Sequence, residues 1–436
     1  MKPLPFLSIA LLLATGAQAE PYCADLLEAE RLPAKYARNA PIYSDAASGW
    51  VFTQDQLKER YAMKPAAQAL VAEIVREFDK RDVALAIVVP PPRPIIAGQA
   101  HLDAAMGEAH HDLDAAQASF GDLITGLAAT GAIVPNLQEL ALSDADLRAA
   151  FYFKRDTHWT TTGALASARA VAQATATARS DLFPDMPADA PAMAPLETTI
   201  EEKGSLARIL RDVCDIEPGR ETAPLYNYAR ASAAGLLADV TDAPRVALLG
   251  SSFSDRYQTD HYRFADALSQ AFDLDVENFS VSGGGPIGAL EGYILSGALD
   301  RRDHPMVIWE LPYTENFNSV SFLRQLLGAL KYRSSGTGDT HAVRDAGAPL
   351  EIEVAQSGLS GIGIETGSLE HQNIRVDVEF VDGSAQRVTL RRRPAVPVDL
   401  RGTHLFGVLG PFGDRTPKTV TATPLKGTEM ITIQLF

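Results

Sequence analysis

The sequence predicts an α/β layer domain followed by a small all-β domain. Over roughly the first 333 of the 436 residues, continuous apolar runs alternate with segments of helical period, which is typical of a parallel sheet between helices. From about residue 348 onward, short alternating segments follow one another with turn residues between them, which favours a β-sandwich. A hydrophobic share of 46% can supply a core to both parts and excludes disorder as the main state.

The α/β part is expected to contain four buried strands. Prolines at 90–92 and 94 end the first apolar run, because proline cannot continue a central ladder. The expected strands are 83–89, 246–249, 276–281 and 306–309, with short additional ones at 49–52 and 132–135. The expected helices are 64–80, 113–129, 162–180 and 262–272, and the Pro- and Ala-rich stretch 182–196 is expected to be a loop.

The predicted domain boundaries follow changes in composition. We expect a signal peptide over 1–19, the α/β domain over 20–333, a linker over 334–347 and the β domain over 348–436. The linker begins with Ser-Ser-Gly-Thr-Gly, which has no strand or helix pattern. The expected strands of the β domain are 350–354, 374–380, 387–390, 419–423 and 430–435.

The N-terminus has the pattern of a cleaved secretory signal. Lys2 precedes a mostly apolar stretch, and Ala17-Gln18-Ala19 is a small-x-small cleavage site, so the mature chain is expected to be exported and to start at Glu20. An uncleaved N-terminal anchor is the alternative. Cys23 and Cys214 both lie in the exported part, where disulfides persist, so we expect them to be paired. Two free buried thiols are the alternative.

Charge and histidine spacing exclude two classes of function. The net charge of −16 argues against a nucleic-acid binder, because neutralising phosphates needs a basic face. His110 and His111 are adjacent and no third ligand stands at motif spacing, so a zinc site is not expected. No cofactor is expected.

Two motifs could supply a nucleophile and its base. Ser252 lies in Gly-Ser-Ser-Phe-Ser directly after the strand 246–249, where a sharp turn can expose a hydroxyl and aim its N–H at an oxyanion. Asp156 and His158 are two residues apart, so in an extended segment both side chains leave the same face. A carboxylate there can orient an imidazole. The alternatives are a serine-rich turn and a structural histidine before a threonine-capped helix.

A glycine-rich turn follows the next strand. Asn278 precedes Gly283-Gly284-Gly285-Pro286, and backbone N–H groups in such a turn could donate to an oxyanion. The turn does not match a phosphate loop or a dinucleotide fingerprint. A tight turn without chemistry is the alternative.

In combination, these motifs resemble the AlgX/AlgJ family of alginate O-acetyltransferases, which have an SGNH-hydrolase-like domain. The resemblance covers roughly residues 25–330 and rests on Gly-Trp-Val-Phe at 49–52, Asp-Thr-His-Trp at 156–159 and Gly-Ser-Ser-Phe-Ser at 250–254. It implies Ser252 as nucleophile, His158 as general base and Asp156 as its orienter. The order Asp, His, Ser is similar to a circularly permuted version of the SGNH fold.

The resemblance also implies a biological setting. It implies acetylation of polymannuronate in the periplasm, an acetyl donor supplied through a membrane-bound acyltransferase, and contact with other alginate secretion proteins. The acetyl-serine oxyanion would be held by backbone donors such as those of Ser252 and Gly284, with Asn278 as a further candidate. The C-terminal β domain resembles the carbohydrate-binding module of AlgX-like proteins.

An acidic protein must meet a polyanion through a local basic patch. Between residues 387 and 426, eight basic and two acidic residues leave an excess of six positive charges. Arginine forks suit carboxylates. The candidates for polymer binding are Arg391, Arg393, Arg401, Arg415 and Lys418. The alternative is a solvated basic edge that discourages edge-to-edge pairing.

Three other functions stay open at the level of sequence. An acetylesterase could use the same triad with water in place of the sugar hydroxyl. The acceptor could be another bacterial exopolysaccharide. A non-catalytic scaffold could bind the polymer and secretion proteins.

Overall fold

The computed structural model describes most of the chain. The described residues are 21–184, 186, 193–228, 245–255, 262–335, 339–345, 349–354, 361–369, 372–409, 416–425 and 430–436. The expected signal peptide, residues 1–19, lies outside them. No helix in the described part of the chain is long and apolar enough to cross a membrane.

A parallel four-stranded sheet forms the centre of the α/β part, in the order β3-β8-β6-β7. Every residue of β3 and β8 is buried, as expected for strands covered on both faces. The strands are β3 (Ala84–Val88), β8 (Met306–Glu310), β6 (Arg245–Leu249) and β7 (Asp275–Asn278). Because all four run in parallel, their carboxyl ends meet at one edge of the sheet, where ligands bind in open α/β folds.

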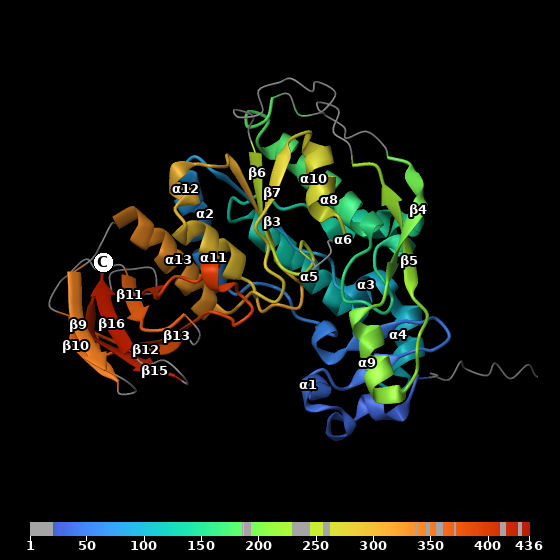
Figure 1. Ribbon diagram of the computed structural model, residues 1–436, viewed down its shortest axis with the longest axis horizontal. Coiled ribbons are helices and arrows are strands. Elements are labelled where there is room, and N and C mark those ends of the chain that lie inside the picture. The colour runs from blue at the N-terminus through green and yellow to red at the C-terminus, as the bar shows by residue number, and fades with distance from the viewer. Residues whose placement is uncertain are drawn as a thin grey trace, which may run out of the picture.

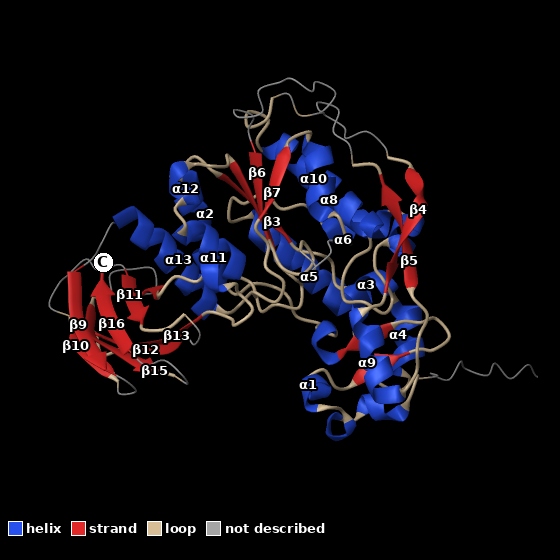
Figure 2. Ribbon diagram, in the orientation of Figure 1, coloured by secondary structure: helices blue, strands red, loops and turns tan. Residues whose placement is uncertain are grey.

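Helices cover both faces of this sheet (Figure 1, Figure 2). On one side lie α2 (Pro65–Asp79), α11 (Gly288–Leu295) and α13 (Val320–Ser335), and on the other lie α8 (Thr161–Ala178) and α10 (Phe264–Phe272). The helix α5 (Leu113–Ala128) packs against α2. The shorter helices are α1 (Ala34–Ala37), α3 (Arg93–Ala97), α4 (Gln99–Met106), α6 (Leu137–Ser143), α7 (Ala145–Ala150) and α12 (Ala298–Arg301).

The C-terminal part is a β-sandwich, as expected. One antiparallel sheet has the order β10-β15-β12-β13 and the other β14-β11-β16-β9. Inward-facing residues of both sheets share one apolar cluster, which includes Val376, Leu390, Ile364 and Leu405. The strands are β9 (Asp339–Asp345), β10 (Leu350–Glu353), β11 (Gly361–Thr366), β12 (Asn373–Phe380), β13 (Ala385–Arg391), β14 (His404–Val408), β15 (Pro417–Pro424) and β16 (Met430–Leu435).

A separate N-terminal lobe packs around α9 (Ser205–Cys214) and carries the disulfide. Its own apolar cluster joins N-terminal residues such as Leu26 and Ile42 to Leu206 and Leu210 of α9. The expected Cys23–Cys214 disulfide is present and closes a loop of 191 residues. The lobe also contains the hairpin of β1 (Ile42–Ser44) and β2 (Val51–Thr53).

Three expectations about the elements need correction. The middle of the expected linker, residues 339–345, forms β9, which pairs with β16 along the edge of a sandwich sheet. The expected loop 182–196 ends in β4 (Pro195–Glu202), which pairs with β5 (Glu221–Tyr226). The expected strand 132–135 is a single bridge from Ile133 to Ala86, because Pro135 cannot continue the ladder.

Candidate active site

Ser252 lies at the carboxyl edge of the sheet, in the turn that follows β6. This turn, Gly250–Ser254, brings the serine towards the Asp-Thr-His segment that precedes α8. His158 Nε2 is 2.8 Å from Ser252 Oγ. His158 Nδ1 is 2.5 Å from Asp156 Oδ1. If Nδ1–H donates to the carboxylate, Nε2 is left to accept the serine proton, so the three residues form a hydrogen-bonded chain in the order expected.

Asp156 is fully buried and is held from several sides. Its Oδ1 accepts the His158 backbone N–H at 2.9 Å, and its Oδ2 accepts the Ser205 N–H at 2.5 Å. Ser205 is the first residue of α9, so the positive end of that helix faces the carboxylate. Tyr262 OH donates to Oδ1 at 3.2 Å and lies 2.9 Å from His158 Nδ1, with its ring stacked on the imidazole.

The segment around His158 is fixed by neighbours on both ends. Trp159 Nε1 donates to the Phe253 carbonyl at 3.0 Å, which ties this segment to the turn that carries Ser252. Thr160 caps α8 by accepting the N–H groups of Thr162 and Gly163, so the expected threonine cap is present two residues after His158.

The buried Arg93 explains the aromatic motif at 49–52. Its guanidinium donates to the carbonyls of Val51, Phe153 and Lys154, and it lies over the rings of Trp50 and Phe52. Burial lowers the pKa of Arg93, and the carbonyls replace the water that the cation loses. This cross-link holds the β1–β2 hairpin against the backbone just before Asp156.

The buried carboxyl group of Glu310, the last residue of β8, accepts hydrogen bonds from the turn that carries Ser252. It accepts the Ser251 N–H at 2.7 Å and the hydroxyls of Ser251 and Ser254 at 3.0 Å. Burial raises the pKa of Glu310 to about 7. Glu310 is a residue near the site that the sequence does not predict.

The residues expected at the oxyanion have different surroundings. Within the described residues, the Ser252 N–H has no acceptor, so it is free to donate to an oxyanion. The Gly284 N–H donates to the Val281 carbonyl at 3.0 Å and is not free, which corrects the expectation for Gly284. Asn278 Nδ2 donates to the Ser254 carbonyl at 2.9 Å, so it supports the serine turn from β7.

The expected basic patch is mostly neutralised. Arg393 pairs with Glu315 at 3.0 Å and Lys418 with Glu379 at 3.3 Å. Arg401 donates to the backbone carbonyls of Val396, Leu369 and Pro394. Arg415 lies outside the described residues. Among the described candidates, Arg391 alone has a guanidinium without a partner. It lines a polar cavity of about 370 Å³ together with Arg393 and Gly284.

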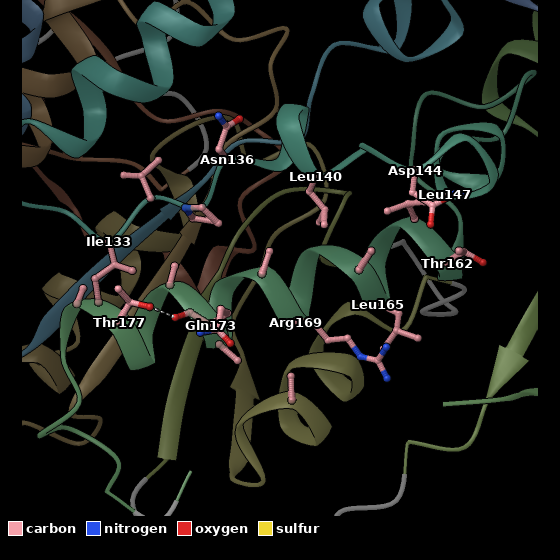
Figure 3. Close-up of a pocket in the computed structure, with 18 of the residues that line it drawn as sticks. Ile133, Asn136, Leu140, Asp144, Leu147, Thr162, Leu165, Arg169, Gln173 and Thr177 are labelled. Carbon is pink, nitrogen blue, oxygen red and sulfur yellow. Dashed lines mark hydrogen bonds between the residues drawn. The ribbon is translucent and has the colours of Figure 1, made fainter. Parts of the chain in front are cut away.

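A larger cavity, about 930 Å³, lies along α8 away from the triad (Figure 3). Figure 3 shows Leu140 and Leu147 above that helix, with Arg169 and Gln173 on it. None of Asp156, His158 and Ser252 lines this cavity. Because none of the three hydrogen-bonded residues lines it, the size of this cavity does not make it the reaction site.

Comparison with known proteins decides the family. A family model described as "SGNH hydrolase-like domain, acetyltransferase AlgX" matches residues 45–313, which is more than half of the chain and contains the whole triad. The chain belongs to the AlgX family. The expected SGNH-hydrolase-like fold and acetyltransferase domain are confirmed.

AlgX and AlgJ proteins are also among the curated relatives of this AlgX-family chain. The alginate biosynthesis protein AlgX of Pseudomonas putida is 26% identical over 371 residues, covering 84% of this chain and 75% of its own. The probable alginate O-acetylase AlgJ of Pseudomonas aeruginosa is 27% identical over 288 residues, covering 61% and 68%. The solved structure of Pseudomonas aeruginosa AlgX shares the fold, with a TM-score of 0.69 at 17% identity and coverage of 95% and 98%.

Proposed function

We propose that this AlgX-family protein is a periplasmic O-acetyltransferase that acetylates mannuronate hydroxyls of alginate through an acetyl-serine intermediate. The observation that carries the proposal is the hydrogen-bonded chain from Ser252 through His158 to Asp156, inside an acetyltransferase domain of the AlgX family. The names of the AlgX and AlgJ relatives support alginate as the polymer.

The first half-reaction forms the acetyl-serine. His158 Nε2 takes the proton of Ser252 Oγ while this oxygen attacks the acetyl carbon of the donor. The negative charge that develops on the acetyl oxygen is met by the free Ser252 N–H. When the intermediate collapses, the bond to the donor oxygen breaks and His158 returns the proton to that leaving group.

The second half-reaction transfers the acetyl group. His158 takes the proton of a sugar hydroxyl, whose oxygen attacks the acetyl carbon, and Ser252 leaves with a proton from His158. An acetylesterase would use water at this step. The outcome therefore depends on how well an acceptor displaces water from the site.

The setting follows from the same proposal. The signal pattern at residues 1–19 supports export to the periplasm, where a membrane-bound acyltransferase would supply the acetyl donor and other alginate secretion proteins would be neighbours. The unpaired guanidinium of Arg391 is the candidate contact for a uronate carboxylate.

An acetyl-transfer assay tests the proposal. Mature protein receives an activated acetyl ester and mannuronate oligomers, and mass spectrometry reads both the oligomers and the protein. Wild type should yield acetylated oligomers and a transient acetyl group on Ser252, and Ser252→Ala should yield neither. The control Ser143→Ala should behave as wild type, because within the described residues the Ser143 hydroxyl hydrogen-bonds only to the Leu140 carbonyl.

Each other outcome has a distinct meaning. Free acetate without acetylated oligomers would indicate an esterase or a different acceptor polymer. Full activity of Ser252→Ala would exclude the serine mechanism. A folded wild type without turnover, even with donor presented by its membrane partner, would favour a polymer-binding scaffold.

A further inference from the structure

Glu310 directs all its short hydrogen bonds to the turn that carries Ser252. Its side chain is 1% exposed and stands at the end of β8, the strand next to β6. Oε2 accepts the Ser251 N–H at 2.7 Å, the Ser251 hydroxyl at 3.0 Å and the Ser254 hydroxyl at 3.0 Å. Three donors from one turn therefore converge on one oxygen atom.

The residues on both sides of Ser252 depend on this carboxylate. Ser251 is bound to it directly, and the Ser251 hydroxyl in turn accepts the Phe253 N–H at 3.2 Å. There is no spare room around the contact, since a Cβ on Gly250 would lie 2.6 Å from Glu310 Oε2. The backbone at Ser252 is thus held before and after the nucleophile.

We propose that Glu310 is a positioning residue, a hydrogen-bond acceptor that fixes the turn so that Ser252 Oγ faces His158. The inference rests on the proposed role of Ser252 as nucleophile. Placing a carboxyl group in the core is costly unless donors compensate it, and within the described residues every donor to Glu310 belongs to the serine turn. Burial raises the pKa of Glu310 to about 7.

The test compares a variant that keeps a hydrogen-bond acceptor at position 310 with one that keeps only the volume of the side chain. In Glu310→Gln the amide oxygen can take the place of Oε2, while Glu310→Leu fills the space without any acceptor. The matched control is Glu77→Leu, because Glu77 of α2 is also buried but pairs with Lys80 and Arg81, which follow the end of that helix. The readouts are the rate at which a sulfonyl fluoride labels Ser252, kcat and KM on an aryl acetate, and the melting curve.

We expect Glu310→Leu to lower the labelling rate and kcat by about 10-fold or more and to leave KM within about twofold of wild type. The reason is that a nucleophile displaced by about 1 Å loses most of the rate enhancement that correct positioning provides. Glu310→Gln should stay within about fivefold of wild type, since one neutral hydrogen bond replaces a charged one. Glu77→Leu should label and turn over at wild-type rates.

Two results would overturn the proposal: wild-type labelling of Glu310→Leu, or equal slowing of the Gln and Leu variants when both melt cooperatively. If Glu310→Leu does not fold, Ser254→Ala decides, since it removes one of the three donors. It should slow labelling about threefold, and a wild-type rate would refute the inference. Ser252→Ala separates the two proposals, because turnover by that variant would refute the nucleophile itself.

Discussion

At the scale of single residues, the imidazole of His158 is held at Nδ1 by more than its carboxylate. Asp156 Oδ1 lies 2.5 Å away, and the hydroxyl of Tyr262 lies 2.9 Å away. Because Tyr262 also donates to Asp156 Oδ1, it stabilises the carboxylate that orients the ring. Tyr262 therefore helps to hold the His158 imidazole in position and to stabilise the negative charge of Asp156.

Tyr262→Phe should lower kcat about 10-fold and leave KM unchanged. The variant keeps the stacked ring and removes only a hydrogen bond to a charged group, which contributes about 1.5–3 kcal/mol. Steady-state kinetics on an aryl acetate measures it. Tyr293→Phe is the control, since Tyr293 makes a similar contact to His304, which is not part of the triad. Equal kinetics of the two variants would contradict the role of Tyr262.

Glu310 should make stability depend on pH. Its pKa rises from 4.5 to about 7 on folding because burial disfavours the charged form. Between these values the folded state binds more protons than the unfolded state, so stability falls as pH rises through this window. The free energy of unfolding of wild type, relative to Glu310→Gln, should fall by about 3 kcal/mol between pH 4 and pH 8. A constant difference in urea unfolding would contradict this.

At the scale of elements, α9 connects the disulfide to the triad. The Ser205 N–H at its first residue donates to Asp156 Oδ2, and Cys214 at its last residue is bonded to Cys23. The helix packs mainly in the N-terminal apolar cluster through Leu206, Ile209 and Leu210. Its position relative to Asp156 thus depends on the lobe that the disulfide closes.

Replacing both cysteines by serine should lower the free energy of unfolding by about 2–5 kcal/mol, since the disulfide closes a long loop. We also expect kcat to fall several-fold well below the melting temperature, because α9 is less tightly held against Asp156. Denaturant unfolding and steady-state kinetics measure the two effects. Reductant should affect the wild type and leave the double variant unchanged. A stability equal to wild type would contradict the prediction.

The elements that could be predicted are those whose signal is local. Apolar runs located β3, β6 and β8, and the two-residue spacing of Asp156 and His158 predicted that their side chains share a face. Their association with Ser252 came from the family resemblance. Glu310 and Tyr262 reach the site through pairings of distant segments, for which a single sequence carries no signal. A count of charges also cannot tell which arginines of the basic patch are already paired, as Arg393 is with Glu315.

At the scale of the whole molecule, a buried ion pair joins the sandwich to the α/β part. Arg392, after β13, pairs with Glu291 of α11 at 2.9 Å, and both side chains are almost fully buried. Gln325 of α13 adds a second connection, because its side chain hydrogen-bonds both to Glu291 and to the backbone of Arg391, the residue before Arg392. The polar cavity beside this joint is lined by both parts, so an acceptor bound there would contact both.

Arg391→Glu should weaken the binding of mannuronate oligomers about 10-fold or more. The change replaces the unpaired cation of this cavity by an anion, which repels a uronate carboxylate. Isothermal titration at two salt concentrations measures the affinity, and the difference should shrink at high salt because exposed charges are screened.

The control for Arg391 is Arg387→Glu, four residues earlier on β13, where Arg387 is paired with Asp377, a carboxylate that Arg375 also contacts. It should weaken binding far less, since Arg387 contributes no free cation. If both variants bind as wild type does, the polymer does not use this face of β13. If both variants lose affinity equally, the polymer responds to the total charge of the sandwich. In that case the cavity between the sandwich and the α/β part has no special role in recognising the polymer.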